Sequence, residues 1–250
     1  MVKFVGILPA RLKSQRFPEK LLAKLQGKSV LQHAYESALK TGCLDQILIL
    51  TDHEKIASVA SSFQAPVIFT SAKPCCGTER IVEALLNNSL PDSATHFINL
   101  QADHPFTSKN TIQNLVKLFE QNKNLEIGTC VTPVTEAEAL LPQIVKCVFT
   151  KNYNALYFSR SPIPSYTKNG SKRIYYQHVG IYGYSRSFLL NYSTIPKSSL
   201  EEAEDLEQLR FLEHGYVIKV ALVNDLAQGV DVPEDLKKCE EILCQLSTSL

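Results

Sequence analysis

The first half of the chain alternates short apolar runs with segments whose apolar residues recur every three or four positions. The runs have the length of buried strands: Lys3–Leu8, Gln46–Leu50, Val67–Phe69 and His96–Leu100. The segments that follow them have helical periodicity: Val30–Ala38, Glu54–Phe63, Thr78–Leu86 and Thr111–Phe119. This alternation predicts an α/β protein in which a mostly parallel sheet carries helices on both faces.

The pattern changes after about residue 125. Ser199 followed by Glu202 is typical of a capping box and predicts a helix to about His214, ended by Gly215. Upstream of this helix the chain has four strand-like runs with no clear helix between them, which favours antiparallel pairing. These runs are Ile127–Val134, Ile144–Phe149, Ala155–Phe158 and Ile174–Tyr184.

A strand at Val217–Val223 and a helix from Pro233 to about Leu246 end the predicted order. The chain shows no internal repeat and no low-complexity linker. We therefore expect a single domain with two parts. A core is formed by about residues 1–125 and 215–250, and a smaller β-rich lobe by about residues 126–214.

Composition narrows the possible partners of this domain. The 250 residues carry 26 Lys+Arg and 25 Asp+Glu, and a net charge of +1 argues against nucleic-acid or anionic-membrane binding. No apolar stretch approaches the ~20 residues of a membrane span, and Phe4–Leu8 is too short for a secretory signal. Seven cysteines without a C-x-x-C pair favour reduced thiols. We expect a cytoplasmic protein with neither nucleic acid nor membrane as a partner.

Four cations gather in the loop that follows the first strand: Arg11, Lys13, Arg16 and Lys20. Ligands of such sheets bind beyond the carboxyl ends of the strands. A triphosphate needs several cations there, because charge moves when a phosphoanhydride bond breaks. A solvated basic loop is the alternative, and the position at the end of the first strand favours phosphate binding.

Two aspartates lie at comparable positions. Asp103 follows the predicted strand ending near Gln101, and Asp231 precedes the helix that starts at Pro233. Carboxylates together with substrate phosphates are the ligands that Mg²⁺ prefers. Each aspartate could instead be a turn or cap residue, and Asp231 could cap the Pro233 helix.

The basic loop opens a series of motifs that together resemble the CMP-Kdo synthetases, also called 3-deoxy-manno-octulosonate cytidylyltransferases. The resemblance covers nearly the whole chain and rests on seven ordered segments: Pro9–Lys20, Gly77–Arg80, Asn99–Asp103, Ala155–Arg160, His178–Tyr184, Leu206–Arg210 and Gly229–Asp231. It implies a Rossmann-like nucleotidyltransferase sheet with a sugar-binding lobe, a homodimer, and transfer of CMP from CTP to Kdo for lipopolysaccharide biosynthesis.

The resemblance also implies roles for individual residues. It assigns a catalytic role at the phosphates to Arg11, Arg16 and Lys20, and it assigns Mg²⁺ binding to Asp103 and Asp231. Nucleotide contacts fall to Ala10, Arg11, Lys20, Gly77, Thr78, Arg80 and Gln101, with Arg80 reaching phosphate or base. Sugar contacts fall to Arg160, His178, Tyr182, Glu207 and Gln208.

Each of these residues has a plainer interpretation as well. Gln101 has the donor and acceptor that a cytosine edge requires, or it makes ordinary strand-end hydrogen bonds. His178 could be a structural histidine. Glu207 and Gln208 could form the solvated face of a helix whose buried stripe is Ala203, Leu206 and Leu209.

The chain departs from the family pattern at two places. Pro74 and Cys76 stand where the family usually has His and Ser, and Ala102 and His104 flank the metal aspartate in place of Gly and Glu. Three alternative functions differ in how well the sequence supports them. The nearest is a cytidylyltransferase for another acidic sugar such as sialic acid, and another is a non-catalytic nucleotide-binding regulator. A dinucleotide dehydrogenase is poorly supported, because no G-x-G-x-x-G follows the first strand.

Overall fold

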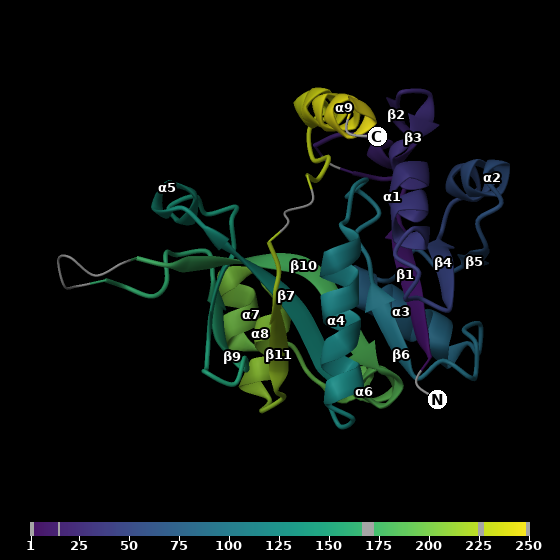
Figure 1. Ribbon diagram of the computed structural model, residues 1–250. Coiled ribbons are helices and arrows are strands. Elements are labelled where there is room, and N and C mark those ends of the chain that lie inside the picture. Colours follow the sequence, from purple (N-terminus) through teal and green to yellow (C-terminus); the bar gives the residue numbers. More distant parts are fainter. Residues whose placement is uncertain (1–2, 15, 167–172, 225–227, 249–250) are drawn as a thin grey trace. The chain divides into compact units, whose positions relative to one another are not determined.

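The computed structural model describes residues 3–14, 16–166, 173–224 and 228–248, with side chains described to residue 244. The chain forms two compact units (Figure 1). The first consists of Met1–Ile112 and Leu226–Leu250, and the second of Gln113–Asp225. The boundary falls within helix α4 (Lys109–Gln121).

The first unit is built on parallel strands in the order β6, β1, β4, β5. Their bounds are β1 (Phe4–Ala10), β4 (Gln46–Thr51), β5 (Val67–Phe69) and β6 (His96–Asn99). Ile7 of β1 lies level with Leu48 of β4 and Asn99 of β6, so these strands end close together. The side chains of β1 and β4 are almost all buried, as expected for a sheet covered on both faces.

Helices α1 (Val30–Leu39), α2 (Glu54–Ser62) and α3 (Gly77–Leu86) connect these strands. The chain moves outward through α1 and α2 and returns across the sheet through α3. Because parallel crossovers are right-handed, α3 lies on the face opposite to α1 and α2. Short elements follow β1, namely η1 (Lys20–Leu22), β2 (Lys24–Leu25) and β3 (Lys28–Ser29), and the final helix α9 (Pro233–Thr248) packs against β2 (Figure 1).

The second unit is mainly antiparallel. Strand β7 (Ile127–Val134) lies between β10 (Tyr175–Ser185), which is antiparallel to it, and β11 (Ile218–Leu222), which is parallel. Strands β8 (Lys146–Phe149) and β9 (Ala155–Ser159) form an antiparallel pair, and β8 also pairs with β10. A mixed α/β fold with a mostly parallel sheet and a smaller antiparallel part is therefore confirmed.

The helices of the second unit differ from the sequence prediction. The structure contains α5 (Glu136–Ala139) between two of the strand-like runs, where no helix was predicted, and α6 (Arg186–Asn191) after the last run, where no element was predicted. Both begin at capping residues, Thr135 and Ser185, whose hydroxyls accept a backbone N–H of the first turn. They are short, so hydrophobic periodicity gave little signal for them.

The predicted helix from Ser199 to His214 is two helices, α7 (Ser199–Glu204) and α8 (Glu207–Glu213). The capping box is Ser198 with Glu201, one residue earlier than predicted. Asp205 ends α7 in the left-handed conformation, with φ of 52°. Because of this break, one buried stripe does not run through both helices: Ala203 of α7 is exposed and Gln208 of α8 is buried. This contradicts the predicted buried stripe at Ala203 and the solvated-face interpretation of Gln208.

An aromatic cluster fixes helices α6 and α8 on strand β10. Phe188 of α6 stacks on Tyr184 of β10 and meets Phe211 of α8 edge-on, with ring centroids 5.5 and 5.1 Å away. Tyr192, in the 3₁₀ turn η2 (Tyr192–Thr194), also packs on Phe211. In the part of the chain that is described, none of the helices has the length and apolar character needed to cross a bilayer.

Candidate active site

The basic loop of the first unit leaves the carboxyl end of β1. Ala10 is the last residue of that strand and is fully buried. Arg11 donates a hydrogen bond to the carbonyl oxygen of Pro74, just before α3 begins. Gly77 starts α3 at a position where a Cβ would lie 3.2 Å from Pro9 and 3.1 Å from Asn99. The glycine therefore lets the amino end of α3, which is the positive end of the helix dipole, approach the ends of β1 and β6.

Lys20 contacts both predicted metal ligands. Its Nζ lies 2.5 Å from Oδ2 of Asp103 and 3.2 Å from Oδ1 of Asp231. Arg16 reaches the same oxygen of Asp231 at 3.0 Å. Burial alone would lower the pKa of Lys20, but the two carboxylates outweigh it and raise the pKa above its ordinary value. The ammonium is therefore held in its charged form between the aspartates.

Backbone contacts explain how two aspartates 128 residues apart (231 − 103) meet. The N–H of Val230 donates to the carbonyl oxygen of Asp103 at 2.9 Å, so the two loops are joined directly. Gly229 faces the ring of His104, where a Cβ would come within 2.8 Å of Nε2. Asp235, in the first turn of α9, accepts hydrogen bonds from the backbone N–H groups of Asp231 and Val232. The carboxylate of Asp231 itself contacts Lys20 and Arg16.

This pair of carboxylates fits a divalent cation. One oxygen of each carboxylate, Oδ2 of Asp103 and Oδ1 of Asp231, contacts the same positive charge, the ammonium of Lys20. Among the described residues, no group of three or more His, Cys, Asp or Glu side chains is arranged to hold a metal ion. Two carboxylates suit Mg²⁺, which usually completes its shell with water and substrate phosphates rather than with a protein cage.

Arg80 of α3 is enclosed by the protein. It has no exposed surface, and it donates to the hydroxyl of Thr70 and the carbonyl oxygen of Ser71. Its Nη2 lies 3.6 Å from Asp52, the residue after β4. Burial lowers the pKa of Arg80, and the nearby charge of Arg11 lowers it further, against the opposing effect of Asp52. Asp52 and Thr70 thus belong to the surroundings of this site, although neither was a predicted site residue.

The two other predicted nucleotide residues of this unit lie at the same strand ends. Thr78 is buried in the first turn of α3. Gln101 is half-buried two residues after β6, on the loop that carries Asp103. The structure therefore brings the predicted nucleotide and metal residues of the first unit to the carboxyl ends of β1 and β6.

In the second unit, His178 and Tyr182 lie together on β10. A bulge after Val179 shifts the register against β7, and Thr129 of β7 fills it by donating to the carbonyl oxygen of Ile181 at 2.8 Å. The two rings are in contact with their planes tilted by 57° and their centroids 5.1 Å apart. Nε2 of His178 bonds to the Thr129 hydroxyl at 2.9 Å, and burial lowers the pKa of His178 to about 3. His178 is therefore a neutral imidazole at physiological pH.

Two buried polar groups of this unit make no hydrogen bond to the described protein atoms. They are the hydroxyl of Tyr182 and Nε2 of Gln208, a residue that is 5% exposed. An unpaired buried donor is costly, so a ligand that accepts hydrogen bonds would relieve both. Glu207 precedes Gln208 in the first turn of α8, and its charge contributes to raising the pKa of Tyr182, after burial and Tyr184.

Arg160 is tied to main-chain oxygens. Its guanidinium donates to the carbonyl oxygens of Glu204 and Asp205 at 2.8 and 3.2 Å, at the break between α7 and α8. Its own carbonyl oxygen accepts from the buried ammonium of Lys146 at 2.5 Å. The side chain thus braces the helix break beside Glu207. A direct contact of Arg160 with a sugar carboxylate stays a prediction.

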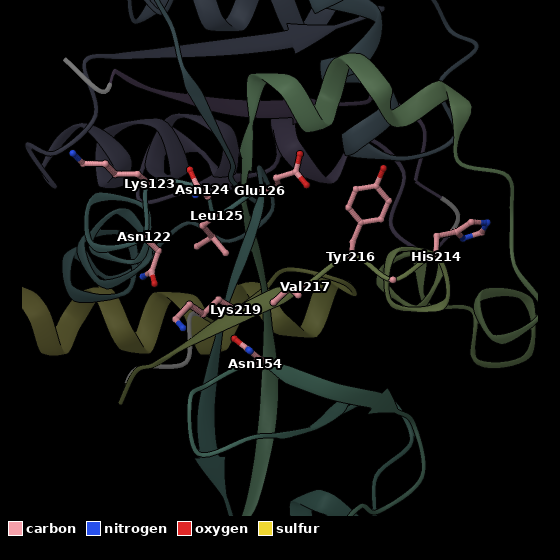
Figure 2. A pocket seen from close by; sticks show the side chains of 11 residues that line it. Asn122, Lys123, Asn124, Leu125, Glu126, Asn154, His214, Tyr216, Val217 and Lys219 are labelled. Atoms are coloured by element: carbon pink, nitrogen blue, oxygen red, sulfur yellow. The ribbon is translucent and has the colours of Figure 1, made fainter.

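An open cavity of about 690 Å³ lies elsewhere in the second unit, between the end of α4 and the start of β11. Figure 2 shows its lining, which includes Asn122, Asn154, Tyr216 and Lys219. None of the predicted site residues lines it, so this cavity does not define the candidate site.

Comparison with known proteins gives one consistent result. A family model described as cytidylyltransferase matches residues 5–222. The 3-deoxy-manno-octulosonate cytidylyltransferase of Protochlamydia amoebophila is 43% identical over 251 residues, which is 99% of this chain and 97% of that protein. The protein of the same name from Chlamydia trachomatis serovar A is 44% identical, covering 98% and 96%.

Solved structures agree with the sequence relatives. CMP:2-keto-3-deoxy-manno-octonic acid synthetase complexed with CTP superimposes with a TM-score of 0.92 at 37% identity, covering 97% of this chain and 99% of that one. The 4-diphosphocytidyl-2C-methyl-D-erythritol synthase of Anaerococcus prevotii has a TM-score of 0.64 at 12% identity, with 97% and 99% covered, and shares the fold.

Proposed function

Because the chain belongs to the cytidylyltransferase family, we propose that it transfers CMP from CTP to 3-deoxy-D-manno-octulosonate (Kdo) and releases pyrophosphate. The product would supply activated Kdo for lipopolysaccharide biosynthesis. The names of its near full-length relatives and of its CTP-bound structural neighbour support this substrate pair. The observation that carries the chemistry is the convergence of Asp103 and Asp231 on Lys20.

The reaction is in-line attack of the anomeric 2-hydroxyl of Kdo on the α-phosphate of CTP. Arg11, Arg16 and Lys20 neutralise the charge that moves onto the departing pyrophosphate. Asp103 and Asp231 would hold Mg²⁺, which would supply further charge neutralisation at the phosphates. The chain thus acts by positioning and electrostatics, and no covalent enzyme intermediate is needed.

The sugar is bound by residues of the second unit. Tyr182 and Gln208 offer buried donors that make no hydrogen bond within the described part of the chain, and Glu207 offers a carboxylate that can accept from a hydroxyl. A polyhydroxylated acid matches this set, because it presents both acceptors and donors. The neutral ring of His178 adds a polar wall without adding charge.

The proposal extends to assembly and location. A homodimer is supported by large apolar side chains that the second unit exposes, including Leu140 and Leu156. Sedimentation velocity of the purified protein tests it, and a monomer at micromolar concentration would contradict it. A cytoplasmic location is supported by cysteines that remain thiols, including Cys43, Cys75 and Cys147. Immunoblotting of fractionated cells tests this location, and recovery in the periplasmic fraction would contradict it.

A pyrophosphate-release assay tests the activity. Four nucleoside triphosphates are combined with Kdo, sialic acid and no sugar, in the presence of Mg²⁺. We expect turnover only in the reaction that contains both CTP and Kdo. Equal turnover with UTP would contradict the cytosine specificity, and turnover with sialic acid would select the alternative acidic-sugar enzyme. CTP binding without any turnover would indicate a nucleotide-binding regulator instead.

A further inference from the structure

The carboxylate of Glu207 is held by a side chain that no substrate role has been assigned to. The hydroxyl of Tyr192 lies 2.6 Å from Oε1 of Glu207. Tyr192 is buried, and its ring packs between Phe188 and Phe211 of the aromatic cluster. Its hydroxyl therefore has a fixed position against the first turn of α8.

A second bond fixes the direction of the first. Nη1 of Arg210 donates to the Tyr192 hydroxyl at 3.2 Å. A guanidinium only donates, so the tyrosine oxygen accepts from Arg210 and its single proton points to Glu207. One oxygen of Glu207 thereby receives a charge-assisted hydrogen bond. This bond fixes Oε1 and thereby sets the orientation of the whole carboxylate.

Arg210 is itself immobilised. Its Nε and Nη2 lie 2.7 and 2.5 Å from the two carboxylate oxygens of Glu201, a bidentate pair. The two side chains are only 7% and 13% exposed. Glu201 also closes the capping box of α7 with Ser198. The hydrogen bond to Glu201 is the main reason that the pKa of Arg210 is raised. The chain Glu201–Arg210–Tyr192–Glu207 thus links α7, η2 and α8.

We propose that Tyr192 is a positioning residue that orients the carboxylate of Glu207 toward a hydroxyl of the acidic sugar. The inference rests on the proposed function, because only that function assigns Glu207 to the sugar. Tyr192 does not touch the substrate in this arrangement. Arg210 and Glu201 hold its hydroxyl in place, and the helix break at Asp205 brings Glu207 to it.

Steady-state kinetics of Tyr192→Phe test this role. The substitution removes one hydroxyl and keeps the ring in its aromatic packing. We expect the KM for Kdo to rise about tenfold, as for loss of one hydrogen bond to a charged group, with the KM for CTP unchanged. Tyr216→Phe is the matched control, because its ring also packs on Phe188, and it should leave both KM values unchanged. A parallel rise of the KM for CTP would overturn the proposal.

A double-mutant cycle shows whether Tyr192 acts through Glu207. Glu207→Ala should raise the KM for Kdo by itself. Tyr192→Phe should add almost nothing in that background, because the group it orients is gone. If Tyr192→Phe still raises the KM by the same factor in the Glu207→Ala enzyme, the hydroxyl acts by another route and the inference fails.

A measurement without substrate separates this inference from the proposed function. The ¹³C resonance of the Glu207 carboxyl, assigned with Glu207→Gln, should shift in Tyr192→Phe and stay in place in Tyr216→Phe. An unchanged resonance in Tyr192→Phe would refute the contact even in an active enzyme. Absence of wild-type turnover together with a shifted resonance would instead refute the proposed substrate and leave the contact standing.

Discussion

Lys20 contacts both acidic residues of the candidate metal site with one ammonium group. The 2.5 and 3.2 Å contacts place that group where a divalent cation would bind the same oxygens. Since like charges repel, the ammonium and a metal ion compete for the two carboxylates. Lys20 would then be free to move to a phosphate oxygen once the metal has bound. Lys20 would therefore weaken metal binding when no substrate is present, although the proposed reaction needs both Lys20 and the metal.

Lys20→Met should consequently change two quantities in opposite directions. Turnover should fall by roughly 10²-fold, comparable to losing one preorganised donor. Mn²⁺, measured by the loss of its free EPR signal in the absence of substrates, should bind more tightly than to wild type. Lys24→Met is the control, because Lys24 is exposed in β2 and should leave both quantities unchanged. Weaker Mn²⁺ binding by Lys20→Met would rule out the competition.

Asp103→Asn and Asp231→Asn should both lose metal binding and turnover, since a hard divalent cation depends on the carboxylate charge. They should differ in stability without metal. Asp103 pairs with Lys20 where both side chains are mostly buried, so its loss should cost about 1–3 kcal/mol. Asp231 is 52% exposed, so its loss should cost less than about 1 kcal/mol. Urea titrations with EDTA measure the difference, and normal turnover of either variant would make that aspartate structural.

Local irregularities of two elements place the residues of the second unit. The bulge of β10 places His178 and Tyr182, four residues apart, opposite Val131 and Thr129, only two residues apart on β7, and the Thr129 hydroxyl bonds within the bulge. The left-handed Asp205 separates α7 from α8 and lets Glu207 start a new helix. Both features interrupt a regular element at a candidate ligand residue.

The buried ring of His178 predicts a pH dependence of stability. Its pKa is about 3 in the folded protein and about 6.5 when unfolded, so between these values the unfolded state binds more protons. The contribution of neutral His178 to the free energy of unfolding is fully present above about pH 6.5, and it is lost as the pH falls toward 3. The melting temperature of wild type should therefore drop more steeply between pH 7 and pH 4.5 than that of His178→Gln. Parallel curves would show that His178 is not buried as a neutral ring.

At the scale of the whole molecule, each compact unit carries one part of the proposed chemistry. The first holds the basic loop, the two aspartates and the amino end of α3. The second holds the strand bulge, the aromatic cluster and the start of α8. The metal and phosphate groups are thus assigned to one unit and the sugar groups to the other.

This division predicts separable kinetic effects. Gln208→Ala removes a buried donor of the second unit and should raise the KM for Kdo about tenfold while leaving the KM for CTP nearly unchanged. Arg11→Ala should instead lower kcat/KM with respect to CTP. Glu202→Ala, on an exposed position of α7, is the control and should behave like wild type. Parallel loss of CTP affinity in Gln208→Ala would contradict the division.

The sequence by itself was enough for the strand–helix order of the first unit. Its strands are buried on both faces, so they are continuous apolar runs, and its helices carry regular apolar stripes. The sequence also placed the basic loop and Asp103 at strand ends, because the carboxyl ends of parallel strands lie on one edge. The family followed from seven motifs in order, which the family model and the relatives confirm.

Only the tertiary structure decided how distant residues meet. Asp231 faces Lys20 because Val230 bonds to Asp103 and Gly229 accommodates His104, contacts between loops that local pattern does not encode. The break at Asp205 escaped prediction, since one non-glycine residue in a left-handed conformation leaves helical periodicity almost intact. Tyr192 was missed for a different reason: it lies in a short turn and meets Glu207 only through the aromatic packing of α6 and α8 around it. Propensity and periodicity act over neighbouring residues, whereas these contacts depend on packing between elements.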